Sequence, residues 1–190
     1  YKRENEHFIV IVGNSNAEKS MFFSRLIEIS QCSDNWEEIT NSDVSGIYKY
    51  GGKQYVIVDL PETYSPAFES VKEKPARDLI SFGKFDSTIV VCDAAHMEQN
   101  LALALQCMEI TNKVIVCVNL MDGLDRNNID VDIDKLSDML GIQVCGISAG
   151  SMQEWDELMY KTSLTVGSKY SNNVYRISYK EEIETGISIM

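Results

Sequence analysis

The chain has 190 residues, of which 44% are hydrophobic and 24% are charged, and this is the size and composition of one globular domain with a full core. Its formal net charge of −12 argues against a binding surface for nucleic acid or for an anionic membrane, because both require a basic patch. No apolar run approaches the roughly 20 residues that span a bilayer, so we expect no direct membrane insertion of this chain.

Apolar runs of strand length alternate with segments of helix length along most of the chain. The strand-length runs are residues 8–12, 55–58, 88–92, 113–118 and 142–147, and the helix-length segments are residues 19–30, 97–110 and 151–162. Several of these runs are nearly continuous Val and Ile, which is typical of strands buried on both faces. The alternation predicts an α/β fold with a parallel sheet wrapped by helices.

One pair of strands is expected to be antiparallel. Residues 44–50 and 53–59 flank Gly51 and Gly52, and two adjacent glycines are a signal for the tight turn of a β-hairpin. In residues 97–110, a stripe at helical spacing is expected to face the core, and it consists of Leu101, Ala102, Leu105 and Met108.

The acidic run over residues 130–134 has two readings. It can be the start of a helix that ends at Gly141, since carboxylates are stabilised near a helix N-terminus. A calcium-binding loop is the alternative, but the run lacks that loop's glycine and its terminal glutamate. We therefore expect a solvated helix start.

The composition changes from Thr165 onward. Gly, Ser and Asn residues up to 173 indicate a linker, residues 174–179 resemble one more short strand, and residues 181–184 would begin a helix. We expect one domain over residues 1–165 and a linker with the start of a second unit over residues 166–190. The sequence begins at Tyr1 without a visible signal peptide, as a fragment or a trimmed chain does.

The cysteines and histidines show no metal-binding pattern. His7 and His96 have no ligand spacing, and no Cys-x-x-Cys pair occurs. Four of the five cysteines lie within apolar runs, as small core residues of a reducing compartment do. The five are Cys32, Cys92, Cys107, Cys117 and Cys145.

A phosphate-binding loop is predicted between the first strand and the first helix. Residues 13–20 read Gly13, Asn14, Ser15, Asn16, Ala17, Glu18, Lys19 and Ser20. The motif Gly-x-x-x-x-Gly-Lys-Ser/Thr is matched except at its second glycine, which is Glu18. In such a loop backbone N–H groups bind phosphate, the lysine reaches the β- and γ-phosphates, and the serine hydroxyl ligates Mg²⁺. Taken alone, the degenerate motif also fits an ordinary strand–helix turn.

Asp59 follows another strand, at the place where P-loop nucleotidases hold Mg²⁺ through a carboxylate, usually by way of water. As the sole observation, it would be an ordinary strand-end aspartate. It stands forty residues after Lys19, and the occurrence of both residues in this order is stronger evidence for a nucleotide site than Asp59 alone.

Two further motifs fit the recognition of guanine. An Asn-x-x-Asp motif closes the strand before it and consists of Asn119, Leu120, Met121 and Asp122. Its aspartate can accept two hydrogen bonds from the N1–H and 2-amino groups of guanine, which adenine cannot offer together. Ser148 and Ala149 follow the next strand and would place a backbone N–H near the guanine oxygen. All four motifs stand at carboxyl ends of strands, where open α/β sheets bind ligands.

Together these motifs resemble the cytosolic G domain of the ferrous iron transport protein B (FeoB) family, a Ras-like GTPase domain attached to a membrane iron transporter. The family patterns Asn-Trp-x-Gly-Val-Thr, Asp-Leu-Pro-Gly-Thr-Tyr-Ser and Asp-Ala-x-x-x-Glu-Arg-Asn-Leu have counterparts at residues 35–40, 59–65 and 93–101. The resemblance covers about residues 8–163, and the tail after residue 173 is similar to the beginning of the family's helical GDP-dissociation-inhibitor-like domain. It implies a Ras-like P-loop GTPase fold with a mostly parallel six-stranded sheet, one antiparallel edge pair and helices on both faces.

The resemblance also implies roles that the residues alone do not show. Thr40 would be the switch I threonine on Mg²⁺ and the γ-phosphate, so Mg²⁺ would lie on Ser20, Thr40 and Asp59. Asn16 would match the asparagine that ligates an activating potassium ion (K⁺) in potassium-dependent members, and residues 66–83 would be switch II. The implied partners are GDP or GTP and the membrane iron-permease portion of the same or a partner protein, with this domain at the cytoplasmic face of the cell membrane.

Three glycines of the family pattern are glutamates here, namely Glu18, Glu38 and Glu62. A positive φ at Glu18 would cost on the order of 1–2 kcal/mol. A carboxylate about 5 Å from a phosphate charge would repel it by roughly 3 kcal/mol at an effective dielectric near 20, which weakens binding ~100-fold. Glu62 stands where a glycine N–H meets the γ-phosphate, so it should affect the triphosphate state most.

Two functions follow from these departures. One is a guanine-nucleotide-binding regulatory domain of an FeoB-like transporter, with weakened phosphate binding and slow hydrolysis. The alternative is a pseudo-GTPase scaffold that keeps the fold and does not switch on GTP. No residue is predicted to be catalytic, because residues 62–63 do not include the water-orienting glutamine of Ras. The FeoB family lacks this glutamine as well. An adenine-specific P-loop ATPase is disfavoured by Asn119 and Asp122.

Overall fold

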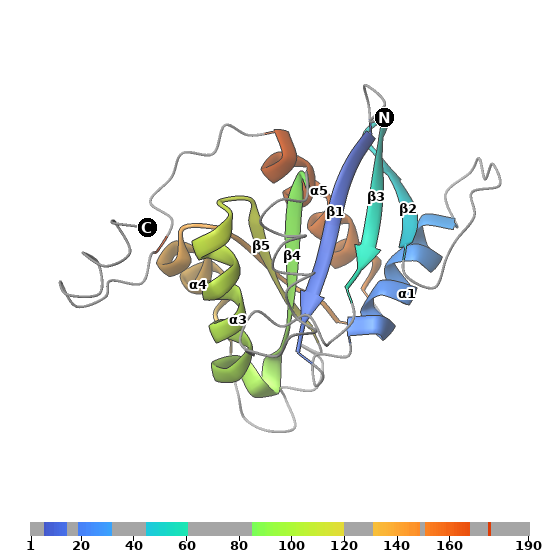
Figure 1. The fold of residues 1–190 in the computed structure, drawn as a ribbon. Coiled ribbons are helices and arrows are strands. Elements are labelled where there is room, and N and C mark those ends of the chain that lie inside the picture. The colour runs from blue at the N-terminus through green and yellow to red at the C-terminus, as the bar shows by residue number, and fades with distance from the viewer. Residues whose placement is uncertain are drawn as a thin grey trace, which may run out of the picture.

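The computed structural model describes residues 6–14, 19–31, 45–60, 85–119, 131–148, 151–167 and 175. Within them six strands form one sheet: β1 (Glu6–Gly13), β2 (Ser45–Tyr50), β3 (Lys53–Asp59), β4 (Ser87–Asp93), β5 (Val114–Asn119) and β6 (Gln143–Gly146). The helices are α1 (Lys19–Gln31), the short 3₁₀ helix η3 (Ala94–His96), α3 (Met97–Ile110), α4 (Ile133–Leu140) and α5 (Met152–Gly167). The sheet order is β2-β3-β1-β4-β5-β6, and β1 lies near its centre (Figure 1).

The sheet is parallel except at one edge. β1 pairs in parallel with β3 and β4, and β5 pairs in parallel with β4 and β6, whereas β2 and β3 are antiparallel. The turn between β2 and β3 contains Gly51 and Gly52 at φ 56° and 75°. Both angles are in the left-handed region, which glycine adopts without steric cost, and they explain why the predicted hairpin forms there.

Helices cover both faces of the sheet. On one face α1 and α5 bury Leu26 and Leu158 against β1, β3 and β5, and the rings of Phe22 and Trp155 lie 4.9 Å apart. On the other face α3 and α4 bury Met108 and other apolar side chains against β1, β4, β5 and β6. β4 and β5 are buried along their whole length, as their Val/Ile runs predict.

The short helix α4 confirms the predicted helix start at the acidic run. The Asp132 carboxylate caps the helix by accepting a hydrogen bond from the Lys135 N–H at 2.9 Å. The helix ends at Gly141, which has φ 67°. The calcium-loop reading is therefore not needed to explain these aspartates.

Two details of the helices differ from the predictions. The stripe of α3 that faces the core contains Leu103, Ala104, Cys107 and Met108, whereas Ala102 is exposed and Leu101 and Leu105 are only partly buried. Met108 of the predicted stripe is therefore confirmed as buried, Leu101 and Leu105 pack against the core while partly buried, and only Ala102 was wrong. α5 continues to Gly167, so the first residues of the expected linker are helical and Thr165 is buried.

The cysteines within the described residues are free and buried, as expected of core residues. Burial raises the pKa of the Cys92 thiol, and likewise that of Cys107, to about 12. Thiols with such a pKa are inert at neutral pH, because the reactive thiolate does not form. Cys32 lies outside the described residues.

After α5 the structure describes one more residue, Tyr175. It has no regular secondary structure, and its backbone N–H donates to the Leu140 carbonyl at 2.9 Å. The other residues of the predicted strand 174–179 and the predicted helix start at 181–184 lie outside the described residues. No helix in the part of the chain that the structure describes is long and apolar enough to cross a membrane.

Candidate functional site

The motifs of the sequence come together along one edge of the sheet. Because β1, β3, β4, β5 and β6 run parallel, their carboxyl ends meet there. The register places Gly13 of β1 beside Val91 of β4, and Asp93 at the end of β4 beside Asn119 at the end of β5. Asp59 ends β3 on the other side of β1.

A charged cluster occupies the part of this edge where β1 leads into α1. Lys19 is the first residue of α1 and is only 3% exposed, and its ammonium group forms an ion pair with the Asp59 carboxylate. The Ser20 hydroxyl donates to the other carboxylate oxygen of Asp59 at 3.3 Å. A buried charge without a partner is strongly destabilising, so each of these charged groups depends on the other.

Gly13 lies close to the backbone of β4, so a side chain there would be tightly packed. A Cβ atom there would stand 3.0 Å from the Val91 carbonyl oxygen, which is backbone and cannot move aside cheaply. It would also lie 3.5 Å from Cδ of Lys19, which is an ordinary van der Waals distance. The first glycine of the predicted loop therefore has a packing reason within this fold.

The next residue, Asn14, joins this loop to α3. Its side-chain amide donates to the Gln99 carbonyl at 3.3 Å. At the end of β4, the Asp93 carboxylate accepts from the Ala95 N–H at 2.9 Å and contacts His96 Nδ1 at 2.5 Å. No sequence pattern predicts the Asn14–Gln99 contact, because these residues are 85 positions apart.

A second cluster lies at the ends of β5 and β6. Asn119 is 6% exposed at the end of β5. The Ile147 N–H donates to the Val118 carbonyl at 2.7 Å, which extends the β5–β6 pairing towards Ser148. The Ser148 N–H in turn donates to Glu154 Oε2 at 2.6 Å. Sequence reasoning missed Glu154, because an acidic residue in the first turn of a helix already has an ordinary explanation.

The structure describes seven of the predicted site residues: Gly13, Asn14, Lys19, Ser20, Asp59, Asn119 and Ser148. The remaining ones lie outside the described residues, and they are Ser15, Asn16, Ala17, Glu18, Thr40, Glu62, Met121, Asp122 and Ala149. Glu38 and residues 66–83 lie outside them too. Among the described side chains, no group of three or more His, Cys, Asp and Glu residues is placed to hold a metal ion.

Comparison with known protein families identifies the chain. The family model described as "Ferrous iron transport protein B" matches residues 7–162. The chain belongs to the FeoB family. This confirms the resemblance drawn from the motifs, and the six-stranded mixed sheet is the Ras-like fold expected for its G domain.

Individual FeoB proteins show the same relationship. The Fe(2+) transporter FeoB of Shigella flexneri is 36% identical over 140 residues, which cover 72% of this chain and 18% of that protein. The FeoB G domain of Methanococcus jannaschii matches with a TM-score of 0.73 at 33% identity, covering 86% of this chain and 99% of that structure. The cytosolic domain of the T. maritima FeoB iron transporter in its GMPPNP form has a TM-score of 0.78 at 27% identity, covering 97% of this chain and 72% of that one. The chain thus spans about a fifth of the length of the curated relative.

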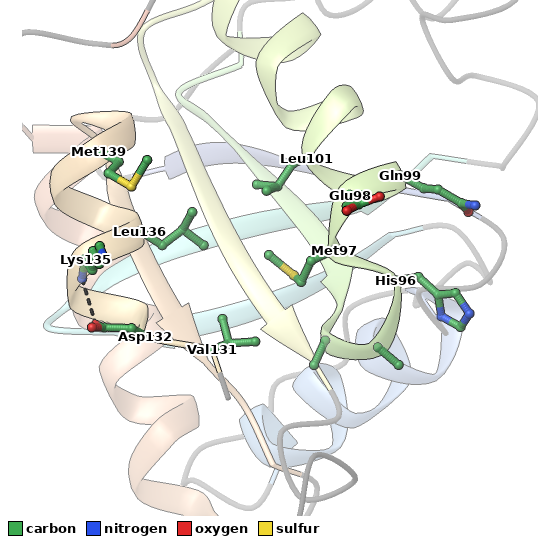
Figure 2. A pocket seen from close by; sticks show the side chains of 12 residues that line it. His96, Met97, Glu98, Gln99, Leu101, Val131, Asp132, Lys135, Leu136 and Met139 are labelled. Atoms are coloured by element: carbon green, nitrogen blue, oxygen red, sulfur yellow. Dashed lines mark hydrogen bonds between the residues drawn. The ribbon is translucent and has the colours of Figure 1, made fainter. Parts of the chain in front are cut away.

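A separate pocket lies between α3 and α4, away from the charged cluster of this FeoB-family domain. It has a volume of about 560 Å³, and its lining includes Met97, Leu101 and Leu136, with Asp132 and Lys135 beside them. Figure 2 shows Met97 on the α3 side and Leu136 on the α4 side of this hollow. None of the predicted site residues lines it.

Proposed function

We propose that this chain is a guanine-nucleotide-binding domain that regulates an FeoB-type ferrous iron transporter. The observation that carries the proposal is the buried ion pair of Lys19 and Asp59, with the exposed Ser20 hydroxyl on the same carboxylate, on the same sheet edge as Asn119 and Ser148. A similar structure also supports it, because the cytosolic domain of the T. maritima FeoB iron transporter is described in a form with GMPPNP, a guanine nucleotide analogue.

The phosphate half of the proposed site uses the loop after β1. Lys19 would contact the β- and γ-phosphates, and N–H groups of residues 13–20 would surround them at the N-terminus of α1. Ser20 and Asp59 offer a hydroxyl and a carboxylate oxygen within 3.3 Å of each other, and such hard oxygen donors suit Mg²⁺. Mg²⁺ would neutralise phosphate charge there. Thr40, and Asn16 for K⁺, would complete the ion sites.

The base half uses the ends of β5 and β6. Asp122 would accept hydrogen bonds from guanine, with Asn119 and Met121 in the same motif. Ser148 and Ala149 would carry the loop N–H that meets the guanine oxygen. The ladder between β5 and β6 supports this assignment, because it brings Ser148 to the strand end that precedes Asp122.

The whole protein is proposed to be a membrane iron transporter of which this chain is the G domain. Under this proposal, residues 1–165 form the G domain at the cytoplasmic face of the membrane, and residues 166–190 lead to a helical domain. The iron-permease portion, in the same or a partner protein, would receive the signal of the nucleotide state.

A pseudo-GTPase is a second candidate, favoured by the three glutamates at glycine positions of the family pattern, Glu18, Glu38 and Glu62. Such a domain would keep its fold and its contact with the transporter and would not switch on GTP. The two candidates differ in one measurable property, which is the affinity for nucleotide.

Titration of fluorescent GDP and GTP into the purified chain, with Mg²⁺ present, tests both candidates. We expect GDP to bind with micromolar affinity, and Lys19→Ala to weaken GDP binding at least tenfold through the lost phosphate contact. Glu18→Gly and Glu62→Gly are the matched comparisons, and each should strengthen GTP binding more than GDP binding if its carboxylate approaches the γ-phosphate. Binding that appears only after glycine is restored would establish the pseudo-GTPase instead.

A further inference from the structure

We propose that Glu154 is a positioning residue for base recognition, which acts by holding the loop that begins at Ser148. The inference rests on the proposed function, since it assigns a determinant of guanine specificity within that same site. Glu154 lies in the first turn of α5, outside every motif of the sequence.

Both backbone groups of Ser148 are fixed by hydrogen bonds. Its N–H donates to Glu154 Oε2 at 2.6 Å, and its carbonyl accepts from the Ser151 N–H at 3.2 Å. A hydrogen bond to a carboxylate is roughly twice as strong as one between neutral groups. Ser148 is therefore the anchored start of a turn that ends where α5 begins.

The anchored residue is itself tied to the strand of the Asn-x-x-Asp motif. Val118 of β5 pairs with Gly146 of β6, and the Val118 carbonyl accepts from the Ile147 N–H at 2.7 Å. Asn119 is the next residue after Val118. Glu154 thus holds the loop at Ser148 in a defined position relative to Asn119. The proposed base site depends on this relative position.

The hydrogen bond from the Ser148 N–H directs the Glu154 carboxylate towards the end of β6. Glu157 on the same helix has a different partner. Glu157 is 51% exposed and pairs with Lys161 at 2.7 Å.

The predicted consequence concerns one atom of the base. Under the proposed function, the N–H of the next residue, Ala149, would contact the guanine 6-oxygen, and displacing the Ser148 peptide would weaken that contact. Guanine and hypoxanthine carry this oxygen, whereas 2-aminopurine lacks it. A loss of positioning therefore weakens the first two bases selectively, whereas a general loss of structure weakens all three.

The experiment measures the dissociation constants of GDP, IDP and 2-aminopurine riboside diphosphate for the unmodified chain and for Glu154→Ala, Glu154→Gln and Glu157→Ala. We expect Glu154→Ala to weaken GDP and IDP binding roughly tenfold, with less than a twofold change for the analogue without the oxygen. Glu154→Gln keeps an acceptor for the Ser148 N–H and should retain most of the affinity. Glu157→Ala is the matched control and should change none of the three.

Hydrogen exchange at the Ser148 amide gives a readout that needs no ligand. We expect exchange to be at least tenfold faster in Glu154→Ala than in the unmodified chain or in Glu157→Ala. If the unmodified chain binds none of the nucleotides, both the proposed function and this inference are overturned. If it binds GDP but Glu154→Ala weakens all three ligands equally, or none, only this inference is overturned.

Discussion

At the scale of single residues, the ion pair of Lys19 and Asp59 links function to stability. Lys19 and Asp59 expose only 2% and 10% of their side chains, so solvent does little to compensate either charge if its partner is removed. The exposed pair of Arg25 and Glu28, with 47% and 63% of the side chains exposed, offers a contrast on the same helix α1. Residues that would bind phosphate and Mg²⁺ thus also hold α1 against β3.

We predict that Asp59→Ala lowers the free energy of unfolding by about 3 kcal/mol, because it leaves the Lys19 ammonium buried and unpaired. The double variant Lys19→Met with Asp59→Ala should recover more than half of this loss, since it removes both charges. Urea unfolding of the single and double variants measures the coupling. Glu28→Ala serves as the control and should cost less than about 0.5 kcal/mol. A loss below about 1 kcal/mol for Asp59→Ala would show that the pair does not support the fold.

At the scale of elements, the hairpin of β2 and β3 depends on backbone conformation at its turn. A Cβ at Gly51 would meet no atom within 4 Å, so the only obstacle to a side chain there is the positive φ of 56°. Gly167 at the end of α5 also has open space around it, without a positive φ. Because neither position has a steric obstacle, comparing an alanine substitution at Gly51 with one at Gly167 measures the effect of backbone strain alone.

We predict that Gly51→Ala lowers the free energy of unfolding by about 1 kcal/mol, and that Gly51→Asn costs less because asparagine tolerates the left-handed region. Gly167→Ala should leave stability unchanged or raise it by about 0.5 kcal/mol. Thermal unfolding of the three variants is the measurement. Equal effects of the two alanine substitutions would mean that φ at the turn does not limit this hairpin.

The sequence predicted the elements better than the contacts between them. The Val and Ile runs identified β4 and β5 because a strand buried on both faces leaves a continuous apolar signature. The buried side of α3 was predicted only in part, because Met108 is buried whereas Leu101 is partly buried and lines the pocket beside α4. The end of α5 was missed because Thr165 and Gly167 are poor helix formers that tertiary packing keeps helical.

The same limit applies to the candidate site. Lys19, Ser20 and Asp59 could be predicted to meet because each belongs to a motif with a known order along a parallel sheet. Glu154 could not, because its role follows from one hydrogen bond to the Ser148 N–H, and no spacing rule specifies that bond.

At the scale of the whole molecule, α5 contributes to the hydrophobic core on one face of the sheet. Trp155 and Leu158 lie in the core that α5 shares with α1, and Thr162 and Thr165 are buried near the helix end. Beyond Gly167, Tyr175 is half exposed and contributes a backbone hydrogen bond to Leu140. The domain boundary at residue 165 stays a prediction, and α5 continues across it to Gly167.

We predict that a chain ended after Gly167 folds with a free energy of unfolding within about 1 kcal/mol of the full chain, the value of the lost Tyr175–Leu140 hydrogen bond. A chain ended after Lys161 should lose about 3 kcal/mol or more, because it removes the buried Thr162 and Thr165 and the partly buried Val166. Urea unfolding compares the three lengths. If the chain ended after Gly167 were as unstable as the shorter one, residues 168–190 would belong to the G domain itself.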